Sequence, residues 1–153
     1  MTPAPYTFRR LQSSDTEQLK ELLNVFGAAF GEIATYRGAV PSDSYLANLL
    51  RKPHFVVLTA IADKQVMGGL TAYVLDKFEQ DRREIYIYDL AVLEAHRRRG
   101  VATGLIGELK RVASALGAYV IFVQADLEDG PAIALYESLG VKETAHHFDI
   151  QVP

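Results

Sequence analysis

The amino-acid sequence predicts an α+β fold, in which helices cover one mixed sheet, and three observations support this. Apolar residues recur at helical spacing in four stretches, and alternating or continuous apolar runs mark six strands. Strands and helices follow one another without an internal repeat or a linker. Because 153 residues can bury a core without disulfides or metals, residues 1–153 are predicted to form a single domain.

The first half of the chain is predicted to contain three strands and two helices. Serine and aspartate residues stand just before each helix, where their side-chain oxygens can cap it. A turn at residues 63–65 joins the last two strands as a hairpin. In chain order the elements are a strand at Tyr6–Leu11, a helix from Asp15 to Phe30, a loop at Gly31–Pro41, a helix after Ser42, and strands at Phe55–Ala62 and Val66–Leu75.

The second half carries the strongest strand signal, at Glu84–Val92, after a charged connection. Gly117 is placed to end the helix before it, and Pro131 stands where a helix can begin. The elements that follow are a helix at Gly100–Leu116, a strand at Tyr119–Val123, a helix through Leu139 and a strand at Val141–Val152.

Composition excludes several classes of protein. The chain is 49% hydrophobic and 23% charged, and its net charge of −3 gives no nucleic-acid footprint. It has no cysteine and its four histidines lack zinc spacing, so we expect no disulfide, no thiolate chemistry and no metal site. No apolar run approaches the ~20 residues of a membrane span, and residues 1–6 lack a signal-peptide core. We therefore expect a cytoplasmic protein without membrane or nucleic-acid partners.

The run Arg97-Arg98-Arg99-Gly100-Val101-Ala102 is the most informative motif. It lies between a strand and a helix, where unpaired amides and the helix dipole favour an anion. Gly100 and Ala102 leave the backbone open to close approach. The motif predicts a pyrophosphate site, and the alternative is a basic, solvated helix start.

These residues resemble the GNAT superfamily of acetyl-CoA-dependent N-acetyltransferases. Arg97, Gly100 and Ala102 match its main signature, and Leu90-Ala91-Val92 precedes them in register. A second signature is matched by Ala132, Tyr136, Leu139 and Gly140, with Asp129 at a position where the family has Asn. The resemblance implies acetyl-CoA as cofactor and a mostly antiparallel sheet, splayed at the cofactor site and flanked by about four helices.

A narrower resemblance is to the type I aminoglycoside 3-N-acetyltransferases. It implies direct acetyl transfer, in a ternary complex, to the 3-amino group of the 2-deoxystreptamine ring of gentamicin-class antibiotics, conferring resistance. The segments that carry it are Phe26-Gly27, Ala34–Tyr36, Tyr45-Leu46, Phe78–Gln80, Glu84–Val92, Gly117–Ile121 and His147–Ile150.

The resemblance also implies roles for individual residues. Tyr136 is expected to protonate the leaving thiolate, and Asp89 to accept the proton of the amine, with a water chain held by Tyr88 and Tyr86 as an alternative. Glu84 and Glu79 are further candidates for the base. The cofactor is expected to contact Leu90, Ala91, Val92, Arg97, Arg98, Arg99, Gly100, Val101, Ala102, Thr103, Asp129 and Tyr136. The carboxylates expected to bind the polycationic substrate are Glu79, Asp89, Asp126, Glu128 and Asp149.

Other functions stay open at this point. An enzyme of the same fold could acetylate a polyamine or a protein amine, and an acyl-CoA sensor could keep the pyrophosphate site without catalysis. A homodimer is also compatible with the sequence, with the C-terminal segment as its contact.

Overall fold

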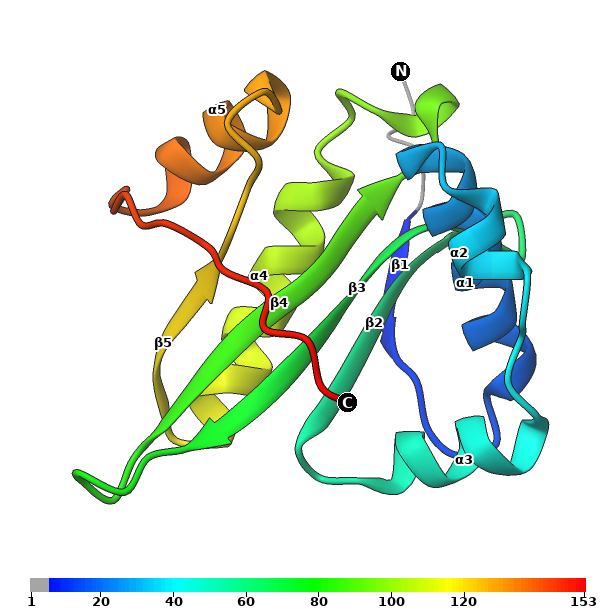
Figure 1. Cartoon of the computed structure of the whole chain (residues 1–153). Helices are drawn as coiled ribbons and strands as arrows, with labels where there is room; N and C mark the ends of the chain where they lie inside the picture. The colour runs from blue at the N-terminus through cyan, green and yellow to red at the C-terminus, as the bar shows by residue number, and fades with distance from the viewer. Residues whose placement is uncertain (1–5) are drawn as a thin grey trace.

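The computed structural model describes residues 6–153, in which helices flank a five-stranded sheet (Figure 1). The strand order is β1-β2-β3-β4-β5, and only the β4–β5 pair is parallel. The predicted mixed, mostly antiparallel sheet is therefore confirmed. The strands are β1 (Thr7–Arg10), β2 (Phe55–Ala62), β3 (Gln65–Asp76), β4 (Arg83–Val92) and β5 (Ala118–Val123).

Between residues 6 and 153, five α-helices and a 3₁₀ turn accompany the sheet, one helix more than the sequence predicts. The additional helix lies within Gly31–Pro41, so the prediction of a loop over this whole range is wrong. Five residues are too few to show a helical apolar stripe, so periodicity could not reveal it. The helices are α1 (Thr16–Phe30), α2 (Ile33–Arg37), α3 (Asp43–Arg51), α4 (Val101–Ala115) and α5 (Gly130–Leu139), and the 3₁₀ turn spans Glu94–His96.

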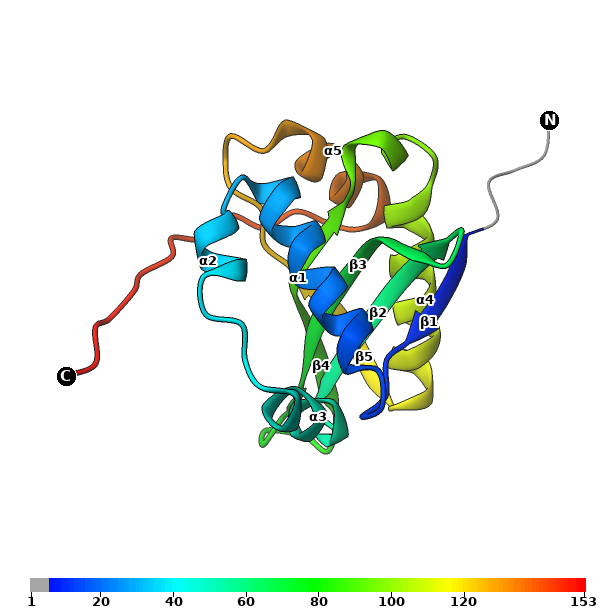
Figure 2. The same ribbon diagram turned by 90° about the vertical axis from the view of Figure 1, so that its right-hand side faces the viewer.

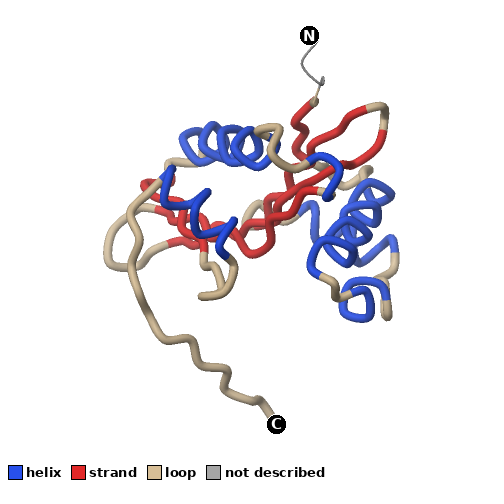
Figure 3. The backbone as a smooth tube through the Cα atoms, turned by 90° about the horizontal axis from the view of Figure 1, so that it is seen from above, coloured by secondary structure: helices blue, strands red, loops and turns tan. Residues whose placement is uncertain are grey.

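The two faces of the sheet carry separate cores because side chains alternate along each strand. Val56 and Leu58 of β2 pack with Leu105 of α4, whereas Phe55 and Val57 pack with helices α1 and α3. Figure 2 shows α1 and α4 on opposite sides of the sheet. The molecule is thus a sheet between two helical layers, as Figure 3 also shows.

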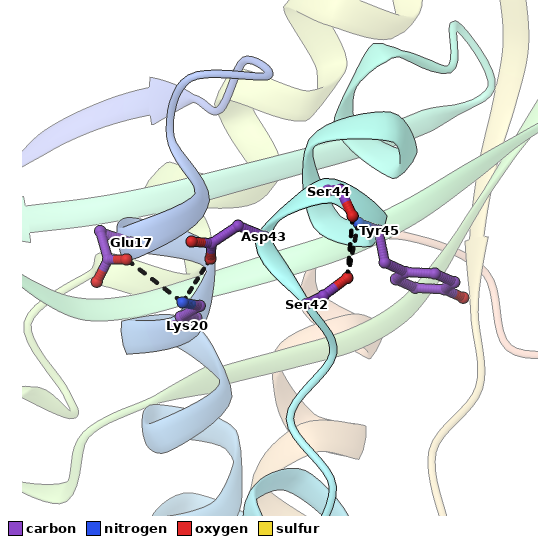
Figure 4. Close-up of polar contacts among 6 residues, drawn as sticks. All are labelled: Glu17, Lys20, Ser42, Asp43, Ser44 and Tyr45. Carbon is purple, nitrogen blue, oxygen red and sulfur yellow. Dashed lines mark hydrogen bonds and ion pairs between the residues drawn. The ribbon is translucent and has the colours of Figure 1, made fainter.

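Helix α3 is fixed to α1 by polar contacts (Figure 4). The ammonium of Lys20 lies 2.5 Å from Asp43 and 3.4 Å from Glu17, and the Asp43 contact is the main cause of its raised pKa. Ser42 caps α3, because its hydroxyl accepts a hydrogen bond from the amide of Tyr45 (3.2 Å). The ring of Tyr45 points away from the ion pair.

Strand β4 contains a bulge and then separates from β5. Asp89 pairs with Thr71 of β3 and Ile87 pairs with Ala72, so Tyr88 is an extra residue in β4. The pairing of β4 with β5 ends at Ile87 and Val123. The sheet therefore opens on the β5 side from Tyr88 onward, which confirms the predicted splay.

The C-terminal segment, residues 141–153, corrects another prediction. The alternation of Phe148, Ile150 and Val152 favours a strand, but among residues 6–153 the segment forms no strand pairing, and it leaves the body after α5 (Figures 2 and 3). A strand needs a neighbouring edge, which an alternating pattern cannot supply by itself. No helix within residues 6–153 is long and apolar enough to cross a membrane. Residues 1–5, expected to lack a signal peptide, lie outside the described part.

Candidate active site

The bulge changes which residues of β4 face each layer. Before it, Ile85 and Ile87 point into the core beneath α4; after it, Leu90 and Val92 do so. A regular strand would have turned Asp89 toward that core with Ile85 and Ile87. The extra residue instead places Tyr88 and Asp89 on the same side, where both line one cavity.

This cavity has a volume of about 210 Å³ and lies between the sheet and the first three helices. Its walls are mostly apolar and aromatic, and among residues 6–153 Asp89 is the only carboxylic acid that lines it. The lining residues are Leu19, Leu22, Leu23, Phe26, Tyr36, Pro41, Tyr45, Leu46, Leu49, Phe55, Thr71, Tyr73, Tyr88 and Asp89.

Two hydroxyl groups hold the carboxylate of Asp89. Tyr36 donates a hydrogen bond to Oδ1 (3.0 Å), and Thr71 donates one to Oδ2 (3.3 Å). Loss of hydration raises the pKa of Asp89, and these two hydrogen bonds partly oppose the rise. A fixed carboxylate with a raised pKa inside a cavity is suited to accept a proton.

Aromatic rings continue from the cavity across the sheet. The ring of Tyr88 meets Tyr73 edge-on at 5.8 Å and Tyr86 at 5.7 Å. The ring of Tyr86 in turn stacks on Phe122 of β5 at 4.7 Å. Such electron-rich faces attract ammonium groups and pack against apolar parts of a ligand.

Beyond the cavity, β4 presents a free backbone edge. The amide of Leu93 donates to Met67 of β3 (2.8 Å), and strand amides alternate in direction. The peptide groups of Leu90 and Val92 therefore point away from β3, toward the side that β5 has left. An extended ligand carrying amides can pair with this edge as another strand would.

The start of α4 continues this edge. Within residues 6–153, the amides of residues 98–103 donate to no protein acceptor, and Gly104 is the first to donate, to Gly100 (2.9 Å). Gly100 adopts φ +78°, and a Cβ there would meet no atom within 4 Å. Arg98 and Arg99 are exposed beside these amides, while Nε of Arg97 donates to the carbonyl of Val92 (3.1 Å). Free amides, a helix dipole and guanidinium groups together form an anion site.

Tyr136 and Asp129 of the second motif have different surroundings. Tyr136 is half-buried against the core beneath α4, and burial is the main cause of its raised pKa. A phenol that stays protonated in this way can donate a proton to a developing thiolate. Asp129 caps α5 by accepting a hydrogen bond from the amide of Ala132 (3.2 Å). Its contact with the cofactor stays a prediction.

The other carboxylates expected to bind the substrate do not line the cavity in the single chain. Glu79 lies in the β3–β4 hairpin and accepts a hydrogen bond from Arg82 (3.2 Å). Asp126 and Glu128 are exposed in the loop between β5 and α5, and Asp149 pairs with His147 (2.8 Å) in the C-terminal segment. Their roles in substrate binding stay predictions.

The structure adds residues that sequence reasoning did not assign to the site. Tyr36 and Thr71 bond Asp89, and Tyr73 and Tyr45 line the cavity. The segments containing Tyr36 and Tyr45 carry part of the narrower resemblance, and this was the signal that could have assigned the two tyrosines to the site. No comparable signal existed for Thr71 and Tyr73, because the sequence does not indicate which strand lies opposite Asp89.

The free edge of β4 and the anion site follow one another in the same order as the pantetheine arm and the diphosphate of acetyl-CoA. Its pantetheine arm carries amides that can pair with Leu90 and Val92, and its diphosphate suits the amides of residues 98–103. The acetyl end of such a ligand would then lie toward Asp89 and the cavity.

Comparisons with solved structures agree with this fold. An aminoglycoside acetyltransferase from an uncultured soil metagenomic sample is 51% identical, with a TM-score of 0.96, and the match covers 97% of this chain and 99% of that one. Another from such a sample, solved in complex with sisomicin, is 29% identical, with a TM-score of 0.89 and 97% of both chains covered.

The amino-acid sequence is also similar to those of known acetyltransferases. An N-alpha-acetyltransferase of Saccharolobus solfataricus is 30% identical over 101 residues, which are 61% of this chain. The chain spans about 60% of the length of that relative. The model of the acetyltransferase (GNAT) family matches residues 19–141. The chain therefore belongs to the acetyltransferase (GNAT) family, whose cofactor is acetyl-CoA.

Proposed function

We propose that this protein transfers the acetyl group of acetyl-CoA to an amino group of an aminoglycoside, at position 3 of the 2-deoxystreptamine ring of the gentamicin class. One observation carries the proposal: the residues of β4 that line the cavity, Tyr88 and Asp89, are followed directly by the free edge Leu90–Val92. An amine in the cavity and an acyl donor on that edge would meet at Asp89.

The reaction needs a proton acceptor, because an ammonium group has no free electron pair. Asp89 takes the proton from the amine, either directly or through a water held by Tyr88. When bound, acetyl-CoA supplies a thioester carbonyl: the amine nitrogen bonds to its carbon and the carbon–sulfur bond breaks. Tyr136 gives its proton to the departing thiolate. The chain has no cysteine, which excludes a cysteinyl acetyl-enzyme, and the proposed route is direct transfer within a ternary complex.

The cavity also supports an amino sugar as the acceptor. Asp89 attracts an ammonium group, and Tyr73, Tyr86 and Tyr88 offer ring faces to further ammonium groups and to sugar carbons. The similar acetyltransferase solved with sisomicin supports the same class of acceptor. Glu79, Asp126, Glu128 and Asp149 stay candidates for binding the remaining cationic groups.

Product analysis tests this function. Gentamicin and spermidine are each incubated with the protein and acetyl-CoA, thiol release is followed, and the position of the new amide is found by NMR. We expect turnover of gentamicin with acetylation at the 3-amino group. Rapid turnover of spermidine without turnover of gentamicin would contradict the proposal, as would binding of acetyl-CoA without thiol release for any amine, the behaviour of an acyl-CoA sensor.

A peptide amine is the second candidate acceptor, favoured by the N-alpha-acetyltransferase relative. Peptides with free N-termini belong in the same assay, and their preferential acetylation would favour it. Resistance of bacteria that express the chain to gentamicin-class drugs is the expected cellular result. A cytoplasmic location stays a prediction. Pairing with a second copy is a separate proposal, because it depends on the C-terminal segment rather than on the cavity.

A further inference from the structure

The cavity beside Asp89 has two parts of different character. Tyr45, Tyr73 and Tyr88 form its outer part, since all three line it and are 60%, 39% and 64% exposed. The lining side chains that are buried are apolar with one exception, Thr71, whose hydroxyl donates a hydrogen bond to Asp89. These buried apolar side chains, which form the inner part, are Leu19, Leu22, Phe26, Leu46 and Phe55. The inner part is therefore a hydrocarbon surface.

The volume of the cavity limits what can enter it. Drug-sized ligands occupy pockets of about 300–1,000 Å³, whereas an apolar cavity of roughly 150 Å³ already holds benzene. The cavity, at about 210 Å³, can hold one ring with a short arm, or an alkyl chain of similar size. An aminoglycoside of several rings would leave most of its atoms outside.

The charge of the cavity matches a single ammonium group. Asp89 is the only carboxylic acid among residues 6–153 that lines it, and its two oxygens are oriented by the hydroxyls of Tyr36 and Thr71. An ammonium group at Asp89 would be paired, but a second charge in the inner part would lose its hydration without gaining a partner. The hydroxyl groups of a sugar would meet the same kind of cost there. The inner part therefore favours a hydrocarbon group that carries one amine.

We propose that the protein also acetylates primary monoamines with a short apolar arm, such as phenethylamine and hexylamine. The arm occupies the inner part of the cavity, and the nitrogen lies beside Asp89. This inference rests on acetyl transfer at Asp89, as the proposed function does, but not on an aminoglycoside as the acceptor. The nitrogen bonds to the carbonyl carbon of the thioester and the carbon–sulfur bond breaks. The ammonium gives up two protons, one to Asp89 and one that balances the proton taken up by the thiolate, so the products are an N-acetyl amide and coenzyme A.

A series of linear amines tests the inference with the unmodified protein. Propylamine, butylamine, pentylamine and hexylamine have nearly equal basicity and differ in the length of the apolar arm. Because each buried methylene contributes a similar transfer free energy, kcat/KM for thiol release from acetyl-CoA should rise about 4-fold per methylene. A series without this rise would overturn the inference.

Two polar amines of the same length as hexylamine are the matched controls. In 5-amino-1-pentanol a hydroxyl replaces the terminal methyl group, and in 1,5-diaminopentane a second ammonium group does so. Both should have a kcat/KM at least ~10-fold below that of hexylamine, because their polar ends lose hydration in the inner part of the cavity. Equal values for hexylamine and the two controls would contradict an apolar site for the arm.

Gentamicin in the same assay separates this inference from the proposed function. Turnover of gentamicin without turnover of hexylamine or phenethylamine would overturn the inference and leave the proposed function standing. Turnover of these two amines with the expected rise, but not of gentamicin, would support the inference and contradict the proposed function. No thiol release with any amine would contradict both. Hexylamine should also inhibit gentamicin acetylation competitively, because both amines need Asp89; inhibition that excess gentamicin does not relieve would place hexylamine elsewhere.

Variants of the cavity wall test where the arm lies. Leu23 of α1 and Leu49 of α3, two helices on the same face of the sheet (Figure 2), line the cavity and are half-buried. In Leu23→Gln/Leu49→Gln the value of kcat/KM for hexylamine relative to propylamine should fall by roughly 10-fold. Leu116→Gln, which changes a half-buried leucine at the end of α4 outside the cavity, is the control and should keep the wild-type ratio. A thermal melt checks folding, and an unchanged ratio in the folded cavity variant would refute the placement of the arm.

Discussion

The hydroxyl of Tyr36 donates a hydrogen bond of 3.0 Å to Oδ1 of Asp89, although 53 residues separate them in the chain. Tyr36 lies on α2, the short helix that packs beside α1, and Asp89 follows the bulge of β4. The contact joins the helical layer to the strand that carries the candidate base. It also links the orientation of Asp89 to the position of α2.

Replacement of Asp89 by Asn should abolish most turnover. The amide cannot accept the proton of the amine, so we expect kcat to fall by roughly 10²–10⁴-fold. Binding of acetyl-CoA should change little, because the expected donor contacts begin at Leu90. Steady-state kinetics with gentamicin and calorimetry with acetyl-CoA measure the two effects. Unchanged kcat would remove Asp89 from the mechanism.

Tyr36→Phe should shift the pH profile of the reaction. The hydrogen bond from Tyr36 stabilises ionised Asp89 and lowers its pKa, so its loss raises that pKa further. Asp89 accepts a proton only above its pKa, so the acid limb of kcat/KM against pH should move to higher pH. Tyr45→Phe, which changes another cavity tyrosine, is the control and should leave the limb in place.

The exposed arginines at the start of α4 should act mainly on cofactor affinity. For Arg98→Gln/Arg99→Gln we expect the Kd of acetyl-CoA to rise by roughly 10-fold at low salt, with kcat nearly unchanged. The affinity that remains should depend less on salt concentration. Calorimetry at several salt concentrations measures this. Arg111→Gln, near the other end of the same helix and paired with Glu108, should behave like the wild type.

Tyr136→Phe should reduce turnover and leave binding intact. The ring still packs against the core beneath α4, but no hydroxyl remains to protonate the thiolate, so kcat should fall by about 10²-fold. Burial raises the pKa of Tyr136, so the wild-type group stays protonated through neutral pH. Thiol-release kinetics, with a thermal melt as a check on folding, test this. A variant with full kcat would assign Tyr136 a packing role only.

Ser42→Ala should loosen α3, which carries Tyr45. Loss of the hydroxyl that accepts from the amide of Tyr45 removes a helix cap, at a cost of about 1 kcal/mol. For a domain of this size Tm should fall by roughly 2–4 °C. Differential scanning fluorimetry measures the change. Ser44→Ala is the control, because its hydroxyl bonds only that of Ser42 and caps no amide; an equal fall in both variants would refute the capping role.

The sequence predicted most of the fold, and of the residues that line the cavity it singled out Tyr88 and Asp89. Alternation and helical spacing located the strands and long helices, because those patterns reflect local geometry. The splay of the sheet beside β4 was implied by the family resemblance and not by the alternation of apolar residues in this strand. The roles of Tyr36 and Thr71 could not be predicted from the sequence, since each depends on which distant segment packs against β4. The prediction of a final strand at Val141–Val152 was wrong because an alternating pattern cannot indicate whether a partner edge exists.

The expected acetyl-CoA contacts and most walls of the acceptor cavity come from different parts of the chain. Donor contacts are expected from backbone groups of Leu90 and Val92 and from the start of α4, whereas most walls of the cavity belong to α1, α2 and α3. Substitutions in these three helices can reshape the acceptor cavity without moving the thioester. New acceptor preferences can therefore arise through substitutions in the N-terminal third of the chain, while the expected contacts with acetyl-CoA stay unchanged.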